Sequence, residues 1–489
     1  MASPISSASP NHRSEIEHQP LSSLRLALKI AAILILSLLL LIPLAMVQGI
    51  VAERQRLQGQ VEASIAESAA GEQQLVGPIL VVPYQLRAEP PAPAMRGGLR
   101  SNEPTLLKVI VPKTLHYDAD IKVEPRQKGI YRALVYRQRA TIKAKFALPA
   151  GLGISGGSEA SARHVVIGEP YLTVAVSDAR GFVRVPEMLW NGRALSVEAG
   201  TRVPAWASGV HAHVASQDMP IRGEALRGAA LVADAVDEHV LEMKVDLMGT
   251  RALHLAPLAG AMTAQIRADW PHPSFSGRWL PIEKTIRDDG FVARWEVNRL
   301  ANTNVASFGD ASLMPQRLPA LERIDIGMVE PLSVYLLVER AIKYGVLFIA
   351  LTFVAFFVFE SLKELAIHPL QYGFVGLALC VFFLLLLSLS EHLSFARAYV
   401  IATGGCLAII GYYLAAVLRS TRRAIGFVIG MSALFTVLYA VLQAEDLALL
   451  MGSVLVFVCL AAVMIATRRV DWYAIATRRT NAPAGRAQT

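Results

Sequence analysis

The sequence predicts an α+β membrane protein with about six transmembrane helices and a large β-rich, antiparallel, sandwich-like domain between the first and second helix. Three observations predict this class. The 489 residues are 54% hydrophobic and only 18% charged, which is too apolar for an ordinary soluble protein of this length. Long apolar runs lie near both ends of the chain. The segment between them alternates apolar and polar residues with the period of a β-strand.

The first apolar run predicts a membrane anchor. It extends from about residue 24 to 51, with Arg13, Arg25 and Lys29 before or near its start. This charge layout resembles a signal sequence, but the apolar core is longer than the roughly 7–15 residues of a cleavable one. We therefore predict a cytoplasmic tail over 1–23 and an uncleaved signal anchor over 24–51 that Pro43 kinks.

The second apolar zone predicts five further spans, at about 343–360, 370–389, 395–418, 424–442 and 446–467. Each run is long enough to cross a hydrocarbon core of roughly 30 Å. With the anchor they make about six, and an even number returns the C-terminus to the cytoplasm. The positive-inside rule agrees, because basic residues follow the fourth and sixth spans: Arg419, Arg422, Arg423, Arg468, Arg469, Arg478 and Arg479. We predict a five-helix bundle over 339–467 and a cytoplasmic tail over 468–489.

The formal net charge of +8 does not indicate a nucleic-acid partner. The arginines gather at the ends of apolar runs without interleaved aromatic residues, which is typical of membrane orientation, so membrane lipid is the predicted partner. Cys380, Cys406 and Cys459 all lie within apolar runs. We predict no disulfide, no cysteine-based metal site and no cofactor.

Residues 52–338 are then extracytoplasmic, which in a bacterium with two membranes means periplasmic. Their first part is rich in Ala, Gln and Glu and predicts a helix that continues from the anchor until Gly71. Beyond Gly71 the period changes to two, as the stretches 140–146, 241–247 and 291–297 show. Such alternation predicts half-buried antiparallel strands, which turn signals such as 287–290 separate.

Three short motifs in the chain have both a chemical and a structural interpretation. The glycine loop 151–157 matches two unrelated catalytic patterns but lacks the helix that both require, which favours a hairpin loop. His211 and His213 have a spacing that metal sites use, but no third ligand is visible in the sequence, so we predict surface or packed histidines and no metal. Gly426 and Gly430 predict close helix contact within the bundle.

The proline-rich segment 269–277 predicts either a rigid turn that closes the β-rich domain or a preorganised recognition loop. Its two prolines restrict the backbone, and its aromatic side chains offer large apolar surfaces. The candidate recognition residues are Trp270, His272 and Phe275.

Polar residues gather at both ends of the predicted bundle. At the cytoplasmic end, Glu360, His368, Gln371 and Tyr372 predict a hydrogen-bonded turn. At the outer end there are two interpretations: ordinary polar loop ends, or an ion-paired cap that docks the β-rich domain or lines a polar cavity. The candidate functional residues there are Glu339, Arg340, Lys343, Glu391, His392 and Arg397, with Glu445 and Asp446 on the same face.

A series of short motifs follows in order from about Ile42 to Tyr473. It includes GPILVVPY (77–84), GIYRALVY (129–136), SDARG (177–181), GVHA (209–212), DWPHPSFSG (269–277), GFVARW (290–295), RAIKY (340–344), HPLQY (368–372), LLLLSLSEH (384–392) and DWY (471–473), with Glu53, Arg54 and Gln55 after the first span. In their order and spacing these motifs resemble the CreD family of cell envelope integrity inner membrane proteins. The resemblance implies an inner-membrane protein with a periplasmic domain and a role in envelope integrity and stress. It implies no settled catalytic activity.

The preferred interpretation is a non-enzymatic inner-membrane protein of the envelope stress response, whose periplasmic domain engages an envelope protein partner. The alternative is a transporter or membrane enzyme acting on lipid or wall precursors through the outer polar residues. None of the apolar runs carries a charge at its middle, where transport sites and proton relays usually show one. Capture of a protein partner would favour the first class, and capture of a lipid or saccharide the second.

Overall fold

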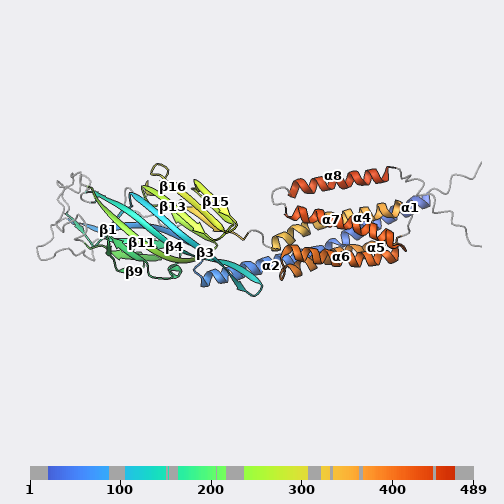
Figure 1. Ribbon diagram of the computed structural model, residues 1–489, viewed down its shortest axis with the longest axis horizontal. Coiled ribbons are helices and arrows are strands. Elements are labelled where there is room, and N and C mark those ends of the chain that lie inside the picture. Colours follow the sequence, from blue (N-terminus) through green and yellow to red (C-terminus); the bar gives the residue numbers. More distant parts are fainter. Residues whose placement is uncertain are drawn as a thin grey trace, which may run out of the picture. The chain divides into compact units, whose positions relative to one another are not determined.

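The computed structural model describes residues 20–87, 105–149, 152, 164–204, 206, 208–215, 236–306, 321–330, 334–362, 367–443 and 448–468. The chain divides into two compact units, a helical one (1–57 and 332–489) and a β-rich one (58–331) (Figure 1). The sequence-based division had placed these boundaries at 51/52 and 338/339. The predicted glycine loop 151–157, apart from Leu152, lies outside the described residues.

The helical unit begins with α1 (Pro20–Leu39) and α2 (Leu41–Ser68), which are interrupted only at Leu40. The interruption confirms the predicted kink, because the ring of Pro43 interferes with the carbonyl group four residues earlier. The predicted helical continuation beyond the membrane anchor is also confirmed. It ends at Ser68, and Ala70 and Gly71 follow with positive φ angles of 67° and 59°.

Five helices form the C-terminal part of this unit and lie side by side in Figure 1. They are α4 (Val334–Leu362), α5 (Pro369–Ser390), α6 (Phe395–Val417), α7 (Thr421–Gln443) and α8 (Ala448–Thr467). The predicted start of the first of them at residue 343 was wrong, since α4 begins nine residues earlier. The charged stretch does not end the helix, because Glu339 and Lys343 pair one turn apart at 2.8 Å.

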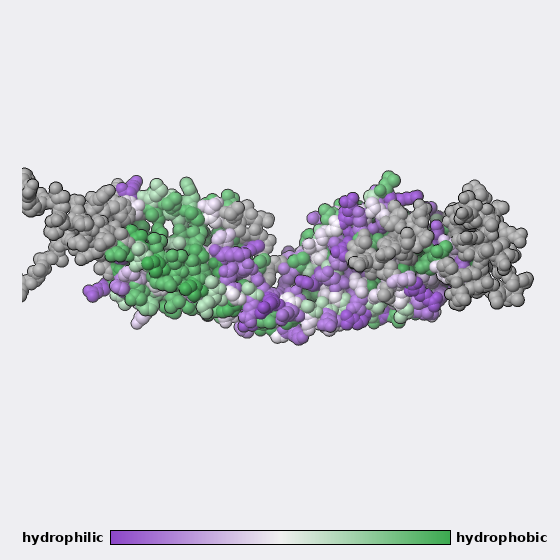
Figure 2. All heavy atoms as spheres, turned by 180° about the vertical axis from the view of Figure 1, so that it is seen from behind, coloured by the Kyte–Doolittle hydropathy of each residue, from purple (hydrophilic) through white to green (hydrophobic). Residues whose placement is uncertain are grey.

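Within the described residues, five helices are long and apolar enough to cross a membrane: Leu28–Ser68, Val334–Glu360, Pro369–Ser390, Phe395–Val417 and Thr421–Gln443. A sixth apolar helix, Leu450–Ile465, is shorter. The count of six spans therefore stays a prediction. Figure 2 shows a broad hydrophobic surface over the helical unit, as expected for helices in contact with lipid tails.

The β-rich unit contains two sheets within the part of the chain that the structure describes. The nine-stranded sheet has the order β14-β17-β12-β1-β6-β10-β9, with β2 and β5 also paired to β1. Its strands are β1 (Gln73–Arg87), β2 (Leu106–Ile110), β5 (His164–Ile167), β6 (Tyr171–Val176), β9 (Val197–Ala199), β10 (Gly209–His213), β12 (Ala252–Ala256), β14 (Pro273–Gly277) and β17 (Ile324–Met328).

The eight-stranded sheet has the order β15-β16-β13-β3-β4-β11-β7-β8. Long hairpins dominate it, and the three stretches predicted as strands from their period lie in β4, β11 and β16. Its strands are β3 (Thr114–Lys128), β4 (Tyr131–Pro149), β7 (Glu187–Trp190), β8 (Arg193–Ala194), β11 (Val236–Thr250), β13 (Ala261–Ala268), β15 (Glu283–Arg287) and β16 (Gly290–Val297). The short helices η3 (Ala179–Gly181) and α3 (Thr303–Ala306) lie between strands.

The two sheets share one hydrophobic core. Leu80 of β1 and Leu172 of β6 pack in the same cluster as Tyr117 of β3, Phe146 of β4 and Trp295 of β16. The sandwich is therefore confirmed, because only the inward face of each alternating strand can supply this cluster. The prediction of a wholly antiparallel domain was wrong at two places, where β1 pairs with β12 and β3 with β13 in parallel.

The last turns of α2 belong to the β-rich unit. Ile65 and Ala69 form a small apolar cluster with Ala133 and Val135 of β4, and Glu62 lies 3.2 Å from Arg251. The helix that carries the first span thus ends as a packed element of the sandwich and not as a free linker.

Candidate functional site

Polar side chains from α2, α4 and the C-terminal end of α5 meet at one end of the helical unit. Arg54 Nε lies 3.3 Å from Glu391 Oε1, and Gln55 Nε2 donates a hydrogen bond to Glu339 Oε2 at 2.8 Å. Lys343 Nζ forms an ion pair with the other carboxylate oxygen of Glu339, Oε1, at 2.8 Å. We call this group the Glu391 cluster, and it consists of Arg54, Gln55, Tyr335, Glu339, Lys343 and Glu391.

The structure places three of the six predicted functional residues in this cluster, namely Glu339, Lys343 and Glu391. His392 and Arg397 are exposed, and the structure describes no ion pair for either side chain. Arg340 is half-buried, and its Nη1 is buried without a hydrogen-bond partner among the described residues. Glu445 and Asp446 lie outside the described residues.

Sequence reasoning did not assign Arg54, Gln55 or Tyr335 to this site. Tyr335 donates a hydrogen bond to Glu391 Oε1 at 3.4 Å, and Arg54 and Gln55 arrive from the other end of the chain. The sequence offers one indication for Arg54 and Gln55, which is that they follow the first span directly in the motif Glu53-Arg54-Gln55. That motif contributed to the family resemblance, but no partner for its side chains is visible in sequence.

A second polar group lies at the opposite end of α4, where this helix ends and α5 begins. Lys29 of α1 forms an ion pair with Glu360 and donates to the carbonyl oxygen of Ile367 at 3.0 Å. Glu360 also accepts hydrogen bonds from the Tyr372 hydroxyl at 2.7 Å and from the Ile367 backbone at 3.1 Å. We call Lys29, Glu360, Ile367 and Tyr372 the Glu360 cluster.

The Glu360 cluster is enclosed, since Glu360 is 5% exposed and Tyr372 is fully buried. A charge in such surroundings is tolerated only when it is paired and hydrogen-bonded. His368 and Gln371 form a reciprocal capping box at the start of α5. The hydrogen-bonded turn predicted from these residues is confirmed, but the contribution of Lys29 was missed.

Between the two clusters the bundle interior is apolar and aromatic. The ring centroids of Phe348 and Phe435 lie 4.6 Å apart, and those of Phe382 and Phe435 lie 4.8 Å apart. The Tyr399 hydroxyl is satisfied locally, because it donates to the carbonyl oxygen of Phe435 at 2.7 Å. The long charge-free stretches 30–52 and 344–359 connect the two clusters along the chain.

The prediction that Gly426 and Gly430 pack within the bundle was wrong. Both glycines are exposed on α7, and a side chain added at either would meet no atom of the described chain within 4 Å. The pattern G-x-x-x-G permits close helix contact but does not choose the partner.

The candidate recognition loop is anchored to the sandwich by its aromatic residues. Trp270 Nε1 donates to the carbonyl oxygen of Val329 at 3.0 Å. Phe275 lies edge-on to Phe291 and Trp295, with ring centroids 5.3 and 5.4 Å away. His272 is exposed. The segment from Pro273 onward is the edge strand β14 rather than a turn, so the contacts of Trp270 and Phe275 fit a packing role.

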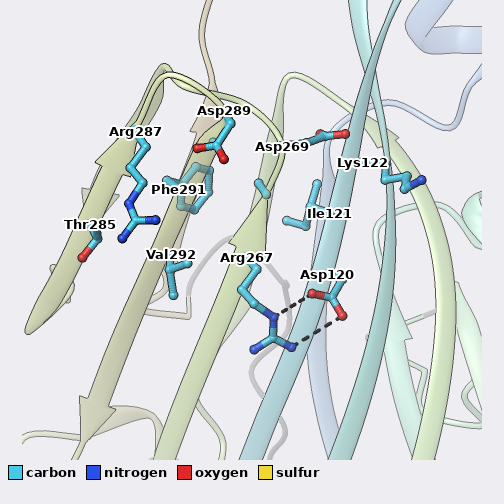
Figure 3. Close-up of a pocket in the computed structure, with 12 residues that line it drawn as sticks. Asp120, Ile121, Lys122, Arg267, Asp269, Thr285, Arg287, Asp289, Phe291 and Val292 are labelled. Atoms are coloured by element: carbon cyan, nitrogen blue, oxygen red, sulfur yellow. Dashed lines mark hydrogen bonds and ion pairs between the residues drawn. The ribbon is translucent and has the colours of Figure 1, made fainter.

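Beside this loop, the outer face of the eight-stranded sheet is hollowed into a pocket of about 740 Å³ that charged and apolar side chains line together (Figure 3). Arg267 crosses its floor and donates to Asp120 Oδ1 at 2.7 Å. Arg287, the last residue of β15, and Asp289, in the turn between β15 and β16, line its upper rim in Figure 3. Acidic and basic groups thus face the same solvent-filled space, an arrangement suited to polar or charged ligands.

The same sheet carries an ion pair with a testable pH dependence. Arg137 donates to both carboxylate oxygens of Asp246, at 2.7 and 2.5 Å, and these hydrogen bonds lower the pKa of Asp246. A lowered folded-state pKa contributes stability above the unfolded value of about 4, which is lost as the pH falls through the folded value. Because the Arg137 side chain is 39% exposed and solvent screens the pair, we expect Asp246→Asn to destabilise the β-rich unit by less than about 1 kcal/mol at neutral pH.

The measurement is chemical unfolding followed by tryptophan fluorescence across the pH range. Five of the six tryptophans lie between residues 190 and 295, so the signal reports this unit. The difference between Asp246→Asn and the unchanged protein should shrink below about pH 4, where the carboxylate protonates. A difference that persisted unchanged at pH 2 would contradict the assignment.

Comparison with known proteins gives two agreeing results. Residues 25–473 match the family described as Inner membrane protein CreD. The chain is also 34% identical over 454 residues to Inner membrane protein CreD of Escherichia coli strain K12, which covers 91% of this chain and 93% of that protein. The chain belongs to the CreD family. The resemblance inferred from the motifs is thereby confirmed, and this CreD family member is a multi-pass protein of the inner membrane.

Among solved structures, the M1 zinc metallopeptidase of Deinococcus radiodurans aligns at 10% identity over 44% of this chain and 42% of its own, with a TM-score of 0.17. A mutant of that enzyme with a bound Tyr-Ser-Ala substrate has the same TM-score at 11% identity. Scores this low carry no argument about the fold or activity of the CreD family member.

Proposed function

We propose that this protein is a non-catalytic component of cell envelope integrity and the envelope stress response. In this proposal the β-rich unit lies in the periplasm and binds another envelope protein, the helical unit anchors it, and both termini are cytoplasmic. Membership of the CreD family supports the inner-membrane location. A tag fused after Thr489 that proved accessible from outside intact cells would contradict the orientation.

The observation that carries the proposal is the double attachment of the first span to the C-terminal helices. Lys29 binds Glu360 in one polar cluster, and Arg54 binds Glu391 in the other. The first span continues as α2 into the β-rich unit, where its last turns are packed. These two ion pairs hold the first span against the C-terminal helices, which preorganises the helical unit as an anchor.

The pocket beside β13 and β16 supplies a surface for such a partner. Arg267, Arg287 and Asp289 present both signs of charge around one hollow, which favours specific orientation of a charged protein surface. Thr285 and Arg287 of β15 are exposed at its edge. These positions therefore allow the pocket to be probed without disturbing the core.

The apolar middle of the bundle counts against a transport role, because midplane sites for ions or substrates need polar groups there. One observation favours a lipid-linked function instead. Arg340 Nη1 is buried and has no hydrogen-bond partner among the described residues, and a guanidinium in this state can take an anionic head group. Lipid that co-purifies with the full-length chain and is lost in Arg340→Gln would support this alternative.

The test is photo-crosslinking in cells from the full-length chain with a photoreactive residue in place of Thr285. We expect capture of one envelope protein, and loss of that capture when Arg287→Glu is added. Leu300 is the matched control position, because it is 98% exposed on the same unit but lies outside the pocket. Capture of lipid or saccharide alone, or equal capture from Thr285 and Leu300, would overturn the proposal.

A further inference from the structure

Two histidines of β10 lie on the face of the nine-stranded sheet that is turned away from the sandwich core. Val210 and Ala212 of the same strand pack into the core between the sheets. Since side chains alternate along a strand, His211 and His213 point to the other face. The edge strand β9 places Glu198 directly opposite His211 in the antiparallel register.

These three side chains converge on one small space. One ligand atom from each of Glu198, His211 and His213 lies within 4.8 Å of the others. His211 Nε2 lies 3.4 Å from Glu198 Oε2. Two ligands of a tetrahedral metal ion with bonds near 2 Å are separated by about 3.3 Å, so this pair is already at a suitable distance. His213 is only partly buried, which leaves its ring room to approach.

A hydrogen bond at Nδ1 of His211 leaves the other ring nitrogen, Nε2, available as a metal ligand. Nδ1 lies 2.7 Å from the carbonyl oxygen of Gly200. A carbonyl can only accept a hydrogen bond, so Nδ1 carries the proton and the neutral ring keeps its lone pair on Nε2. An imidazole that donates its second N–H to a carbonyl is the usual arrangement around a bound metal.

Both ring nitrogens that face this space are buried without a hydrogen-bond partner among the described residues: His211 Nε2 and His213 Nδ1. His211 itself is only 3% exposed. Packed structural histidines normally satisfy such atoms, because a buried unpaired acceptor is unfavourable. Two unsatisfied nitrogens beside one carboxylate therefore point to a missing shared partner.

We infer that Glu198, His211 and His213 bind one divalent first-row transition-metal ion, with Zn²⁺ the best match. Imidazole nitrogen with carboxylate oxygen suits this class of ion, whereas Mg²⁺ and Ca²⁺ prefer oxygen ligands alone. Glu169 can supply a fourth ligand, since its Oε2 lies 3.7 Å from His213 Nδ1.

Metal binding at this site would stabilise the edge of the nine-stranded sheet. Strand β9 has only three residues and pairs with β10 alone among the described strands. A metal that joins Glu198 to the two histidines cross-links this edge strand to its neighbour. The sequence shows the histidine pair, but the third ligand becomes visible only through the pairing of β9 with β10.

The test uses the full-length protein, purified in detergent and treated with a chelator. After addition of Zn²⁺ and removal of the unbound ion, elemental analysis should find one zinc per chain. Co²⁺ in its place should give the visible absorption of a cobalt ion with nitrogen and oxygen ligands. Binding of less than one tenth of an equivalent at micromolar Zn²⁺ would overturn the inference.

Variants separate the site from adventitious binding. His213→Ala and Glu198→Gln alter partly or largely exposed side chains, so both should fold, and each should weaken Zn²⁺ binding at least tenfold. His272→Ala is the matched control, because it removes an exposed histidine of the same unit and should leave one zinc per chain. Unchanged affinity in His213→Ala, or equal loss in His272→Ala, would refute the assignment.

Discussion

Replacing Glu360 by glutamine is expected to destabilise the helical unit by about 3–5 kcal/mol, because it leaves a buried charge without its counter-ion. Lys29 has a side chain that is only 16% exposed and is paired with Glu360. The carboxylate has two acceptor oxygens, which serve Lys29, Tyr372 and the Ile367 backbone together. A glutamine amide has one acceptor oxygen, so at least one of these donors loses its partner.

The double variant Lys29→Met/Glu360→Gln is expected to recover most of this loss. Removing both charges also removes the penalty for holding an unpaired ammonium group out of water. Glu53→Gln is the matched control, since Glu53 is exposed on α2 and its replacement should change stability by less than about 0.5 kcal/mol. If Lys29→Met made Glu360→Gln worse, the ion pair could not be the cause.

The cysteines of the bundle provide the measurement. Cys380 and Cys406 are buried, with 2% and 6% of their surface exposed, so they react with a thiol reagent only when the helices separate. The more exposed Cys459 is first replaced by serine. Heating the detergent-solubilised chain with a fluorogenic thiol reagent then gives the unfolding temperature of the bundle for each variant.

Gly209→Ala is expected to destabilise the β-rich unit by about 3–5 kcal/mol. Gly209 begins β10 with a φ angle of 148°. A Cβ atom there would overlap the carbonyl oxygen of Val174 and lie 2.9 Å from the Cα atom of Ala175. These are backbone atoms of β6, so relief requires separation of β10 from its neighbour.

Gly192→Ala is the control for Gly209→Ala. Gly192 also has a positive φ angle, 81°, but a side chain added there meets nothing within 4 Å. We expect about 1 kcal/mol from the backbone conformation alone. Unfolding followed by tryptophan fluorescence measures both variants, and equal losses in the two would show that close packing against β6 is not responsible.

The sequence alone predicts part of the Glu360 cluster, but it does not predict the close contact at Gly209. Glu360 and Tyr372 were expected to meet because both lie at the ends of consecutive spans, only 12 residues apart. Lys29 was assigned to membrane orientation alone, since its partner is 331 residues away. Gly209 belongs to a recognised family motif, but the reason for glycine is a contact with a strand that the motif does not contain.

The Glu391 cluster could likewise be predicted only in part from the sequence. Glu339, Lys343 and Glu391 could be selected as polar residues beside apolar runs, whereas Arg54 and Gln55 join them only when α2 packs on the bundle. His392 and Arg397 satisfy the same sequence criterion and remain outside the Glu391 cluster. The sequence therefore predicts which polar residues lie at the end of an apolar helix, but not which ion-pair partner each of them takes.

Hydropathy and residue period determine where this chain enters the membrane and where it forms strands, because both properties act along neighbouring residues. The kink near Pro43, the helix up to Ser68 and the strands around 140–146 and 291–297 follow from them. The parallel pairs β1/β12 and β3/β13 and the meeting of Glu198 with His211 depend on which distant segments pack together. That choice is made by the shape of the whole core, and only the tertiary structure contains it.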